Sequence, residues 1–115
     1  MKSVKVVFHI DEVDKWPLLL ANVRNLVKVV DVPSSQIVVL ANAKAVTAFN
    51  GGGAPEHQQA IADLSASGVA ILACQNSLNG LKISAAQLPG FVAVVPVGVL
   101  TLIEKQSQGF AYIKP

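Results

Sequence analysis

Cys74 is the residue whose type and position point most directly to chemistry. It is the single cysteine of the sequence, and it follows the apolar run 69–73, which is typical of a buried strand. Residues 75–79 predict one helical turn, which the Asn79-Gly80 pair ends. Free N–H groups at the start of a helix favour a thiolate, the reactive form of cysteine. The position therefore indicates a reactive thiol, although a free cysteine is as often a small buried hydrophobe.

Polar side chains near the predicted strand ends are the further candidates. Asn76 and Ser77 can donate hydrogen bonds to a charged sulfur. A nearby His9 imidazole would hold or remove the thiol proton, although a histidine at a strand end is more often solvated or hydrogen-bonded. Ligands bind at the carboxyl edge of a parallel sheet. The residues expected at that edge are His9, Asp11, Glu12, Asn42, Cys74, Gln75, Asn76, Ser77 and Pro96. Of these, we predict Cys74 and His9 as catalytic and Asn42, Gln75, Asn76 and Ser77 as binding residues.

Other motifs carry weaker signals. The glycine-rich segment 50–53 precedes a predicted helix, where it would cradle a phosphate. It lacks the Lys-Ser/Thr pair of a P-loop and does not match the dinucleotide-binding pattern, so a flexible loop is favoured. Asp11 and Glu12 are adjacent and point in different directions from an extended chain, which disfavours an acid/base pair. His9, His57 and the cysteine lie too far apart for metal-ligand spacing, so neither a metal nor a cofactor is expected.

Strands and helices alternate along the sequence. Aliphatic and β-branched runs predict strands at 4–10, 36–41, 69–73 and 91–95, with an edge strand at 111–113. Periodic segments predict a helix that Asp14 caps, that holds Pro17 in its first turn and that extends to Val30, then helical segments at 44–49, from Pro55 onward, at 84–88 and at 97–106. This alternation implies right-handed crossovers. We predict one three-layer α/β/α domain over residues 1–115, with a mainly parallel sheet of about five strands.

Composition excludes several classes of protein. The 115 residues fit one domain. Hydrophobic residues make up 52% and charged residues 14%, which excludes a disordered chain. A net charge of +2 without a basic cluster disfavours nucleic-acid binding. The charge-free stretch 83–103 is long enough to cross a bilayer, but two prolines and two glycines divide it. We expect no membrane span and, without a signal-peptide cleavage site, a cytoplasmic location.

The predicted closing helix is apolar around most of its circumference. Only Thr101 interrupts its hydrophobic residues Val97, Val99, Leu100, Leu102 and Ile103. A surface helix of a monomer shows a polar stripe instead. Apolar side chains that point away from the sheet need another partner, and a second copy of the chain is the simplest one. The helix therefore predicts a homo-oligomer.

Several segments resemble a known family. The segment GVAILACQNSL, from Gly68 to Leu78, is similar to the cysteine-bearing segment of the DsrE/DsrF-like sulfur-relay proteins. KVVFHIDE at 5–12, VVPVG at 94–98 and GFAYIKP at 109–115 resemble a small prokaryotic branch of that family. The resemblance implies an α/β/α fold, assembly as a trimer or hexamer, and a cysteine that carries sulfur as a persulfide. Gln75, Asn76 and Ser77 are neutral where relatives tend to have a charged residue.

Two functions follow as hypotheses. In the first, Cys74 takes sulfane sulfur from a donor protein and gives it to an acceptor protein. In the second, the chain is a non-catalytic oligomeric module that binds a small ligand at the carboxyl edge of the sheet. A redox sensor is disfavoured because the chain has no second cysteine to resolve an oxidised thiol.

Overall fold

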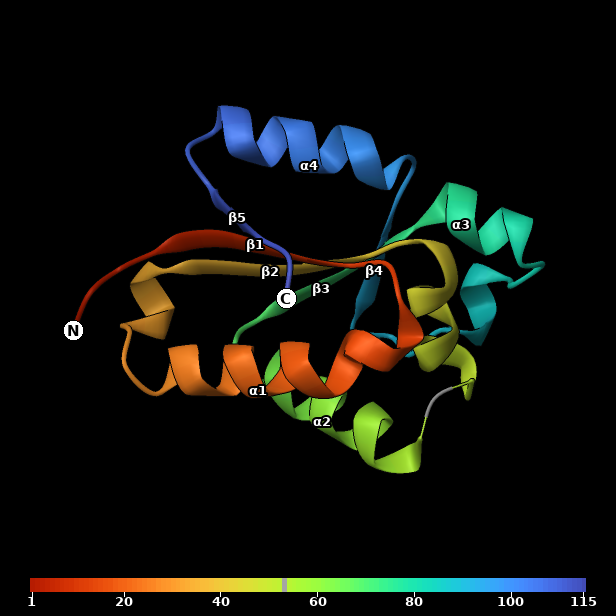
Figure 1. The fold of residues 1–115 in the computed structure, drawn as a ribbon, viewed down its shortest axis with the longest axis horizontal. Helices are drawn as coiled ribbons and strands as arrows, with labels where there is room; N and C mark the ends of the chain where they lie inside the picture. The colour runs from red at the N-terminus through yellow and green to blue at the C-terminus, as the bar shows by residue number, and fades with distance from the viewer. Residues whose placement is uncertain (53) are drawn as a thin grey trace.

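The computed structural model describes residues 1–52 and 54–115, and a parallel sheet forms its centre (Figure 1). Within these residues the strands are β1 Lys5–Ile10, β2 Gln36–Ala41, β3 Ala70–Cys74, β4 Val92–Val95 and β5 Ala111–Ile113. The sheet order is β4-β3-β2-β1-β5, and each neighbouring pair is parallel. All strands therefore end at one edge, as the sequence predicts.

Helices cover both sides of this sheet. The α-helices are α1 Trp16–Val27, α2 Pro55–Ala66, α3 Gln75–Gly80 and α4 Gly98–Ser107, and the 3-10 helices are η1 Val13–Lys15, η2 Val32–Ser34, η3 Ala43–Asn50 and η4 Ala85–Gln87. Figure 1 shows α1 and α2 on one side of the sheet and α4 on the other, with α3 beyond the end of β3. The predicted three-layer α/β/α architecture is confirmed.

Side chains alternate along each strand, so β1 to β4 each contribute to a hydrophobic cluster on either side of the sheet. The two clusters differ in size. In β1, Phe8 and Ile10 join the large hydrophobic cluster beneath α1, together with Trp16 and Leu19. Val7 faces the opposite layer. The smaller cluster there consists of Val7, Val38, Leu40, Leu102 and Phe110. Most of the apolar burial is thus on the α1 and α2 side.

Two features of the first helix were predicted wrongly. Asp14 does not cap it: Asp14 lies inside η1, whose Lys15 N–H donates to the Glu12 carbonyl, and α1 starts directly afterwards without a side-chain cap. A 3-10 turn that leads straight into a helix leaves no extended residue to act as a cap. The helix also ends at Val27 and does not reach Val30, because Val30 forms a parallel bridge with Lys2.

The remaining elements start and end close to their predicted positions. The predicted helical segment 44–49 forms η3, and the short helix predicted at 84–88 is the 3-10 turn η4, which Ser84 caps. The predicted loop 50–53 includes Gly51, which has φ 96° and closes η3 in the left-handed region that suits glycine. Gly53 of that loop lies outside the described residues.

Candidate functional site

Cys74 occupies the junction between β3 and α3. It is the last residue of β3 and also the N-cap of α3, with φ −77° and ψ 117°. Strand side chains alternate in direction, so Cys74 lies on the same side of the sheet as Leu72, which packs against the cluster beneath α4. Cys74 is only 5% exposed. The predicted arrangement of strand, cysteine and helical turn is therefore present, with the sulfur turned towards the α4 layer.

The first turn of α4 approaches the same sulfur. The Gly98 N–H donates a hydrogen bond to Cys74 Sγ over 3.3 Å. A Cβ atom at position 98 would lie 3.2 Å from Cys74 Cβ and 3.5 Å from Sγ. Glycine therefore lets the positive end of a ten-residue helix come close to the thiol.

Ser77 supports the cysteine from α3. Its hydroxyl accepts a hydrogen bond of 2.8 Å from the Ala43 N–H, and its side chain also hydrogen-bonds Cys74. Ala43 has φ 50°, in the left-handed region that costs a non-glycine residue about 1 kcal/mol or more. The hydrogen bond from Ala43 to Ser77 ties the end of β2 to the start of α3.

The surroundings of Cys74 favour its thiolate. Burial by itself raises the pKa of the thiol. Hydrogen bonds from the Ser77 side chain and from the backbone N–H groups of Gly98, Ser77 and Asn76 act in the opposite direction and outweigh burial, so the pKa lies below its ordinary value. Donors from the first turns of two helices thus converge on one sulfur.

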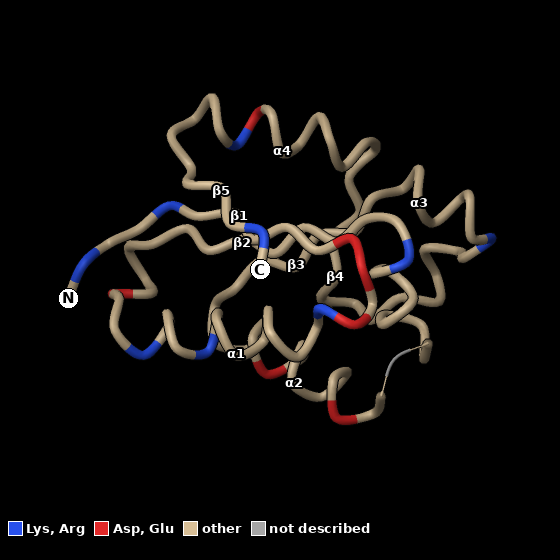
Figure 2. Tube along the Cα trace, in the orientation of Figure 1, with Lys and Arg blue, Asp and Glu red and all other residues tan. Residues whose placement is uncertain are grey.

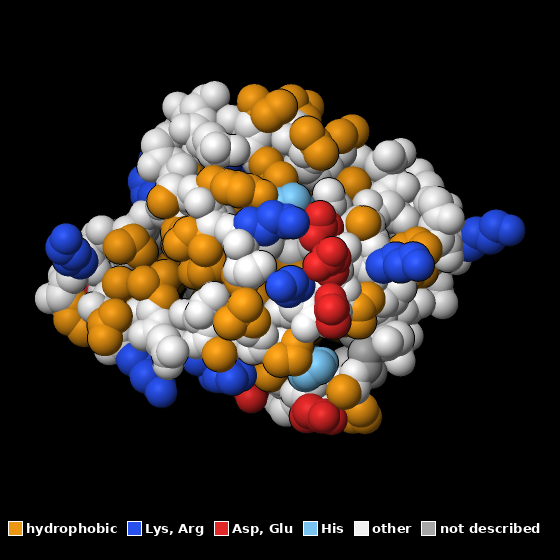
Figure 3. Space-filling view, in the orientation of Figure 1, with side chains coloured by type: hydrophobic (Ala, Val, Ile, Leu, Met, Phe, Trp, Pro, Cys, Tyr) orange, Lys and Arg blue, Asp and Glu red, His pale blue; other side chains and the backbone are white. Residues whose placement is uncertain are grey.

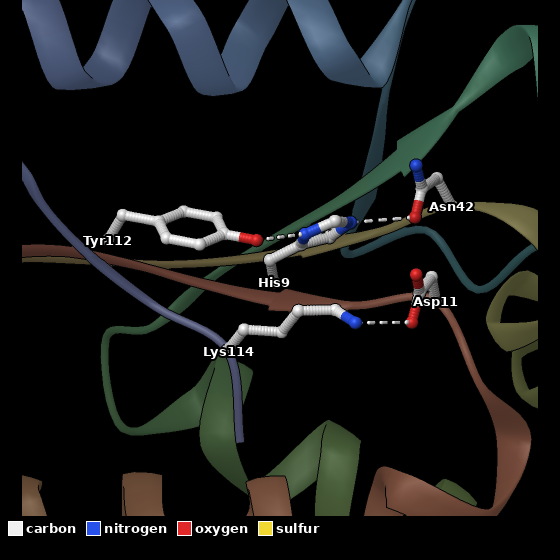
Figure 4. A network of polar contacts seen from close by, with 5 residues as sticks. All are labelled: His9, Asp11, Asn42, Tyr112 and Lys114. Carbon is white, nitrogen blue, oxygen red and sulfur yellow. Dashed lines mark hydrogen bonds and ion pairs between the residues drawn. The ribbon is translucent and has the colours of Figure 1, made fainter.

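His9 belongs to a second polar group at the same edge of the sheet (Figure 4). Its Nδ1 lies 2.6 Å from the Tyr112 hydroxyl and its Nε2 lies 2.9 Å from Asn42 Oδ1. His9 is buried, at 9% exposure. It stands on β1, and β2 separates that strand from β3 and Cys74. Its ring nitrogens therefore engage Tyr112 and Asn42, and Asn42 stands between His9 and the cysteine.

The other predicted edge residues are spread around this centre. Asp11 pairs with Lys114 at 3.3 Å (Figure 4). The Gln75 side chain donates to Asn79 Oδ1, along α3. Asn76 is exposed and contributes its backbone N–H to the thiol. The structure thus brings Asn42, Cys74 and Ser77 together, whereas Asp11 and the Gln75 side chain have other partners.

Two residues of the site were missing from the sequence prediction. In the sequence Gly98 stands out only as a break in an apolar stretch, and Tyr112 only as part of an edge strand. Tyr112 lies on β5 and pairs with Val7 of β1, the strand that also carries His9. Its contact with His9 therefore depends on β5 being the neighbour of β1 in the sheet. The glycine at the first position of a helix was the one available signal for a close approach.

Charge and metal-ligand geometry add little to the site. The Lys and Arg residues of the described ranges are distributed over several elements (Figure 2). In residues 1–52 and 54–115, no three His, Cys, Asp or Glu side chains are placed to hold a metal ion. No helix in the same ranges has the length and hydropathy needed to span a membrane. The candidate site is therefore defined by its hydrogen bonds.

Fold and site together define a class: three-layer α/β/α proteins with a hydrogen-bonded cysteine at the carboxyl edge of a parallel sheet. The family model described as DsrE/DsrF-like family matches residues 16–115, and the chain belongs to this family. The family resemblance of the sequence is thereby confirmed. A comparison with curated proteins finds no match.

Two solved structures share the fold. The protein of unknown function MTH1491 from Methanobacterium thermoautotrophicum is 33% identical, with a TM-score of 0.87 over 98% of this chain and 100% of its own. The ychN protein from E. coli is 18% identical, with a TM-score of 0.69 over 100% of both chains. The second similarity concerns the fold alone.

Proposed function

We propose that the protein is a sulfur carrier that holds sulfane sulfur as a persulfide on Cys74. The main support is the convergence of hydrogen-bond donors on Cys74 Sγ, which includes the 3.3 Å contact from Gly98. A thiolate is the form that attacks a sulfur–sulfur bond. Membership of the DsrE/DsrF-like family supports the same chemistry.

The proposed transfer consists of two thiol–persulfide exchanges. The Cys74 thiolate attacks the outer sulfur of a donor persulfide, a new S–S bond forms, and the donor leaves as a thiolate. An acceptor thiolate then attacks the outer sulfur on Cys74, and the Cys74 thiolate leaves. Each step breaks one S–S bond and forms one, so no external oxidant or reductant is needed. The chain has one cysteine, so the donor and acceptor sulfurs belong to other molecules, which we propose are partner proteins.

Loading with a persulfide donor tests this function. We expect intact-mass measurement to show one added sulfur per chain after incubation with inorganic polysulfide. Cys74→Ser should show none, and treatment with a reductant should remove the sulfur from the wild type. A wild-type chain that gains no sulfur, or a variant that gains the same amount, would contradict the proposal.

The proposal includes assembly as a homo-oligomer in the cytoplasm, where thiols stay reduced. On α4, Val99, Leu100 and Ile103 are 55%, 52% and 56% exposed, whereas Leu102 is 6% exposed. Figure 3 shows apolar side chains gathered at this end of the molecule. An apolar helix face of this kind fits an isologous or ring-forming contact between copies, and a trimer or hexamer would cover it.

Two lysine substitutions separate assembly from folding. Leu100→Lys places a charge on the exposed face and should dissociate the oligomer while the chain keeps its circular dichroism spectrum. Leu102→Lys buries a charge without a partner and should unfold the chain. Light scattering at low micromolar concentration measures the first effect. A wild-type mass near 12.0 kDa would overturn the proposed assembly.

A further inference from the structure

Three neighbouring strands bring a polar side chain each to the α4 side of the sheet. His9 continues the row of Val7 on β1, and Cys74 continues the row of Leu72 on β3, and both rows belong to the layer beneath α4. Asn42 follows β2 two positions after Leu40, which lies in the same layer. Because Ala41 pairs with Ala73, Asn42 and Cys74 are neighbours across adjacent strands.

The contacts of His9 fix the orientation of the Asn42 amide. Asn42 Oδ1 faces His9 Nε2 at 2.9 Å, and a carboxamide oxygen only accepts, so Nε2 carries the proton. In the neutral ring Nδ1 is then the acceptor, and the Tyr112 hydroxyl donates to it over 2.6 Å. The amide oxygen is thereby occupied, and the amide NH2 remains the outward donor of Asn42. Figure 4 shows this nitrogen pointing to the α4 side of the sheet.

Gly98 shows how close this amide stands to the cysteine. The position of a Cβ at residue 98 would be 3.6 Å from Asn42 Cβ and 3.5 Å from Cys74 Sγ. Asn42 and Cys74 therefore flank the same backbone residue. Among the described residues, the Asn42 amide nitrogen has no hydrogen-bond acceptor, and no fully buried side-chain nitrogen or oxygen lacks a partner, so this NH2 has access to solvent.

We infer that the Asn42 amide donates a hydrogen bond to the outer sulfur of a persulfide on Cys74, and that Tyr112 and His9 hold the amide in the orientation for this bond. The inference rests on the proposed sulfur-carrier function. Asn42 contacts the transferred atom in this assignment, and His9 and Tyr112 are positioning residues. This assignment gives the polar group of His9, Asn42 and Tyr112 a role in binding the persulfide.

The inner and outer sulfur atoms would then have different donors. The inner sulfur already receives the N–H of Gly98 and the hydrogen bond of Ser77. The outer sulfur lies about 2 Å further from the strand, at an ordinary S–S bond length. It bears the negative charge of a deprotonated persulfide, and a donor beside it stabilises that anion. Asn42 should therefore affect the persulfide and leave the unloaded thiol unchanged.

The test compares two titrations in each variant. Unloaded protein and protein loaded with inorganic polysulfide are reacted with iodoacetamide over a range of pH, and intact mass gives each rate. In Asn42→Ala, which keeps the Cβ beside Gly98, we expect the apparent pKa of the persulfide to rise by about one pH unit. The apparent pKa of the thiol should stay at the wild-type value. Tyr112→Phe should raise the persulfide pKa by less, because the His9–Asn42 bond remains.

Asn25→Ala is the matched control, since Asn25 is exposed on α1, on the opposite side of the sheet. It should leave both titrations unchanged. An Asn42→Ala persulfide that titrates like the wild type would overturn the inference, and so would an equal rise for thiol and persulfide, which would indicate a packing effect on Gly98. These outcomes leave the sulfur-carrier function standing. If the wild type takes up no sulfur at all, both proposals fail.

Discussion

The two faces of the sheet differ in how they are packed. Beneath α1 and α2, Trp16 is fully buried, packs edge-on against Phe49 with ring centroids 5.7 Å apart, and donates a hydrogen bond to the Ala45 carbonyl. Beneath α4, Leu102 and Phe110 cover a smaller cluster, and His9 lies at its edge. One face thus supplies most of the hydrophobic stabilisation. The other face can therefore hold polar and reactive groups at small cost to folding.

Truncating one leucine in each face gives the largest expected effect. Leu19→Ala, in the α1 layer, should lower the free energy of unfolding by about 4 kcal/mol, and Leu102→Ala by about 2 kcal/mol. The loss at Leu102 is smaller because Leu102 belongs to the smaller cluster, whereas Leu19 is fully buried in the larger one. Urea denaturation at one protein concentration measures both. Equal losses would show that the two faces contribute alike.

Gly98→Ala probes the contact between α4 and the cysteine. The new Cβ would press on Cys74 Cβ and move the Gly98 N–H away, so the apparent pKa of the thiol should rise by about one unit. Stability should change little, since alanine is a better helix former than glycine. The pH dependence of alkylation measures the pKa. A thiol that titrates as in the wild type would mean that the helix contact does not favour the thiolate.

Ser77→Ala should also raise the apparent pKa of the thiol, because the Ser77 side chain is the largest of the contributions that lower it. The variant removes the side-chain hydrogen bond to Cys74 but keeps the backbone donors of Ser77, Asn76 and Gly98. The alkylation profile should move to higher pH by about one unit. Ser107→Ala, at an exposed position at the end of α4, is the control and should leave the profile unchanged.

The smallest effect is the contribution of the thiolate to stability. The pKa of Cys74 is lowered in the folded chain, so folding gains from the thiolate at pH values above the unfolded pKa of about 8.5, and this gain is lost as pH falls through the folded pKa. The difference in unfolding free energy between the wild type and Cys74→Ser should therefore grow as pH is raised towards that value. A difference that is flat or that shrinks with rising pH would contradict the lowered pKa.

Local signals in the sequence explain which parts of this structure were predictable. The run before Cys74 and the Asn79-Gly80 pair after it carry the strand and the helix end within a few residues, so the junction could be placed. The predicted cap at Asp14 was wrong because Asp14 lies within the 3-10 turn that leads into α1. The contacts of Tyr112 and Gly98 depend on strand order and on the position of α4, which no local pattern encodes.

The contact between His9 and Tyr112 joins residues 103 positions apart in the sequence. β5 has three residues, all of them exposed, and it pairs with β1 alone in the described sheet. Pairing of β5 with β1 closes a loop that includes most of the chain, and the entropy lost in closing it disfavours early pairing during folding. It also belongs to the part of a fold that detaches in the least costly local openings, where amide hydrogens exchange first. Each such opening releases Tyr112 from His9 while β1, β2 and β3 stay paired, so the Tyr112 contact is the most transient element of the site.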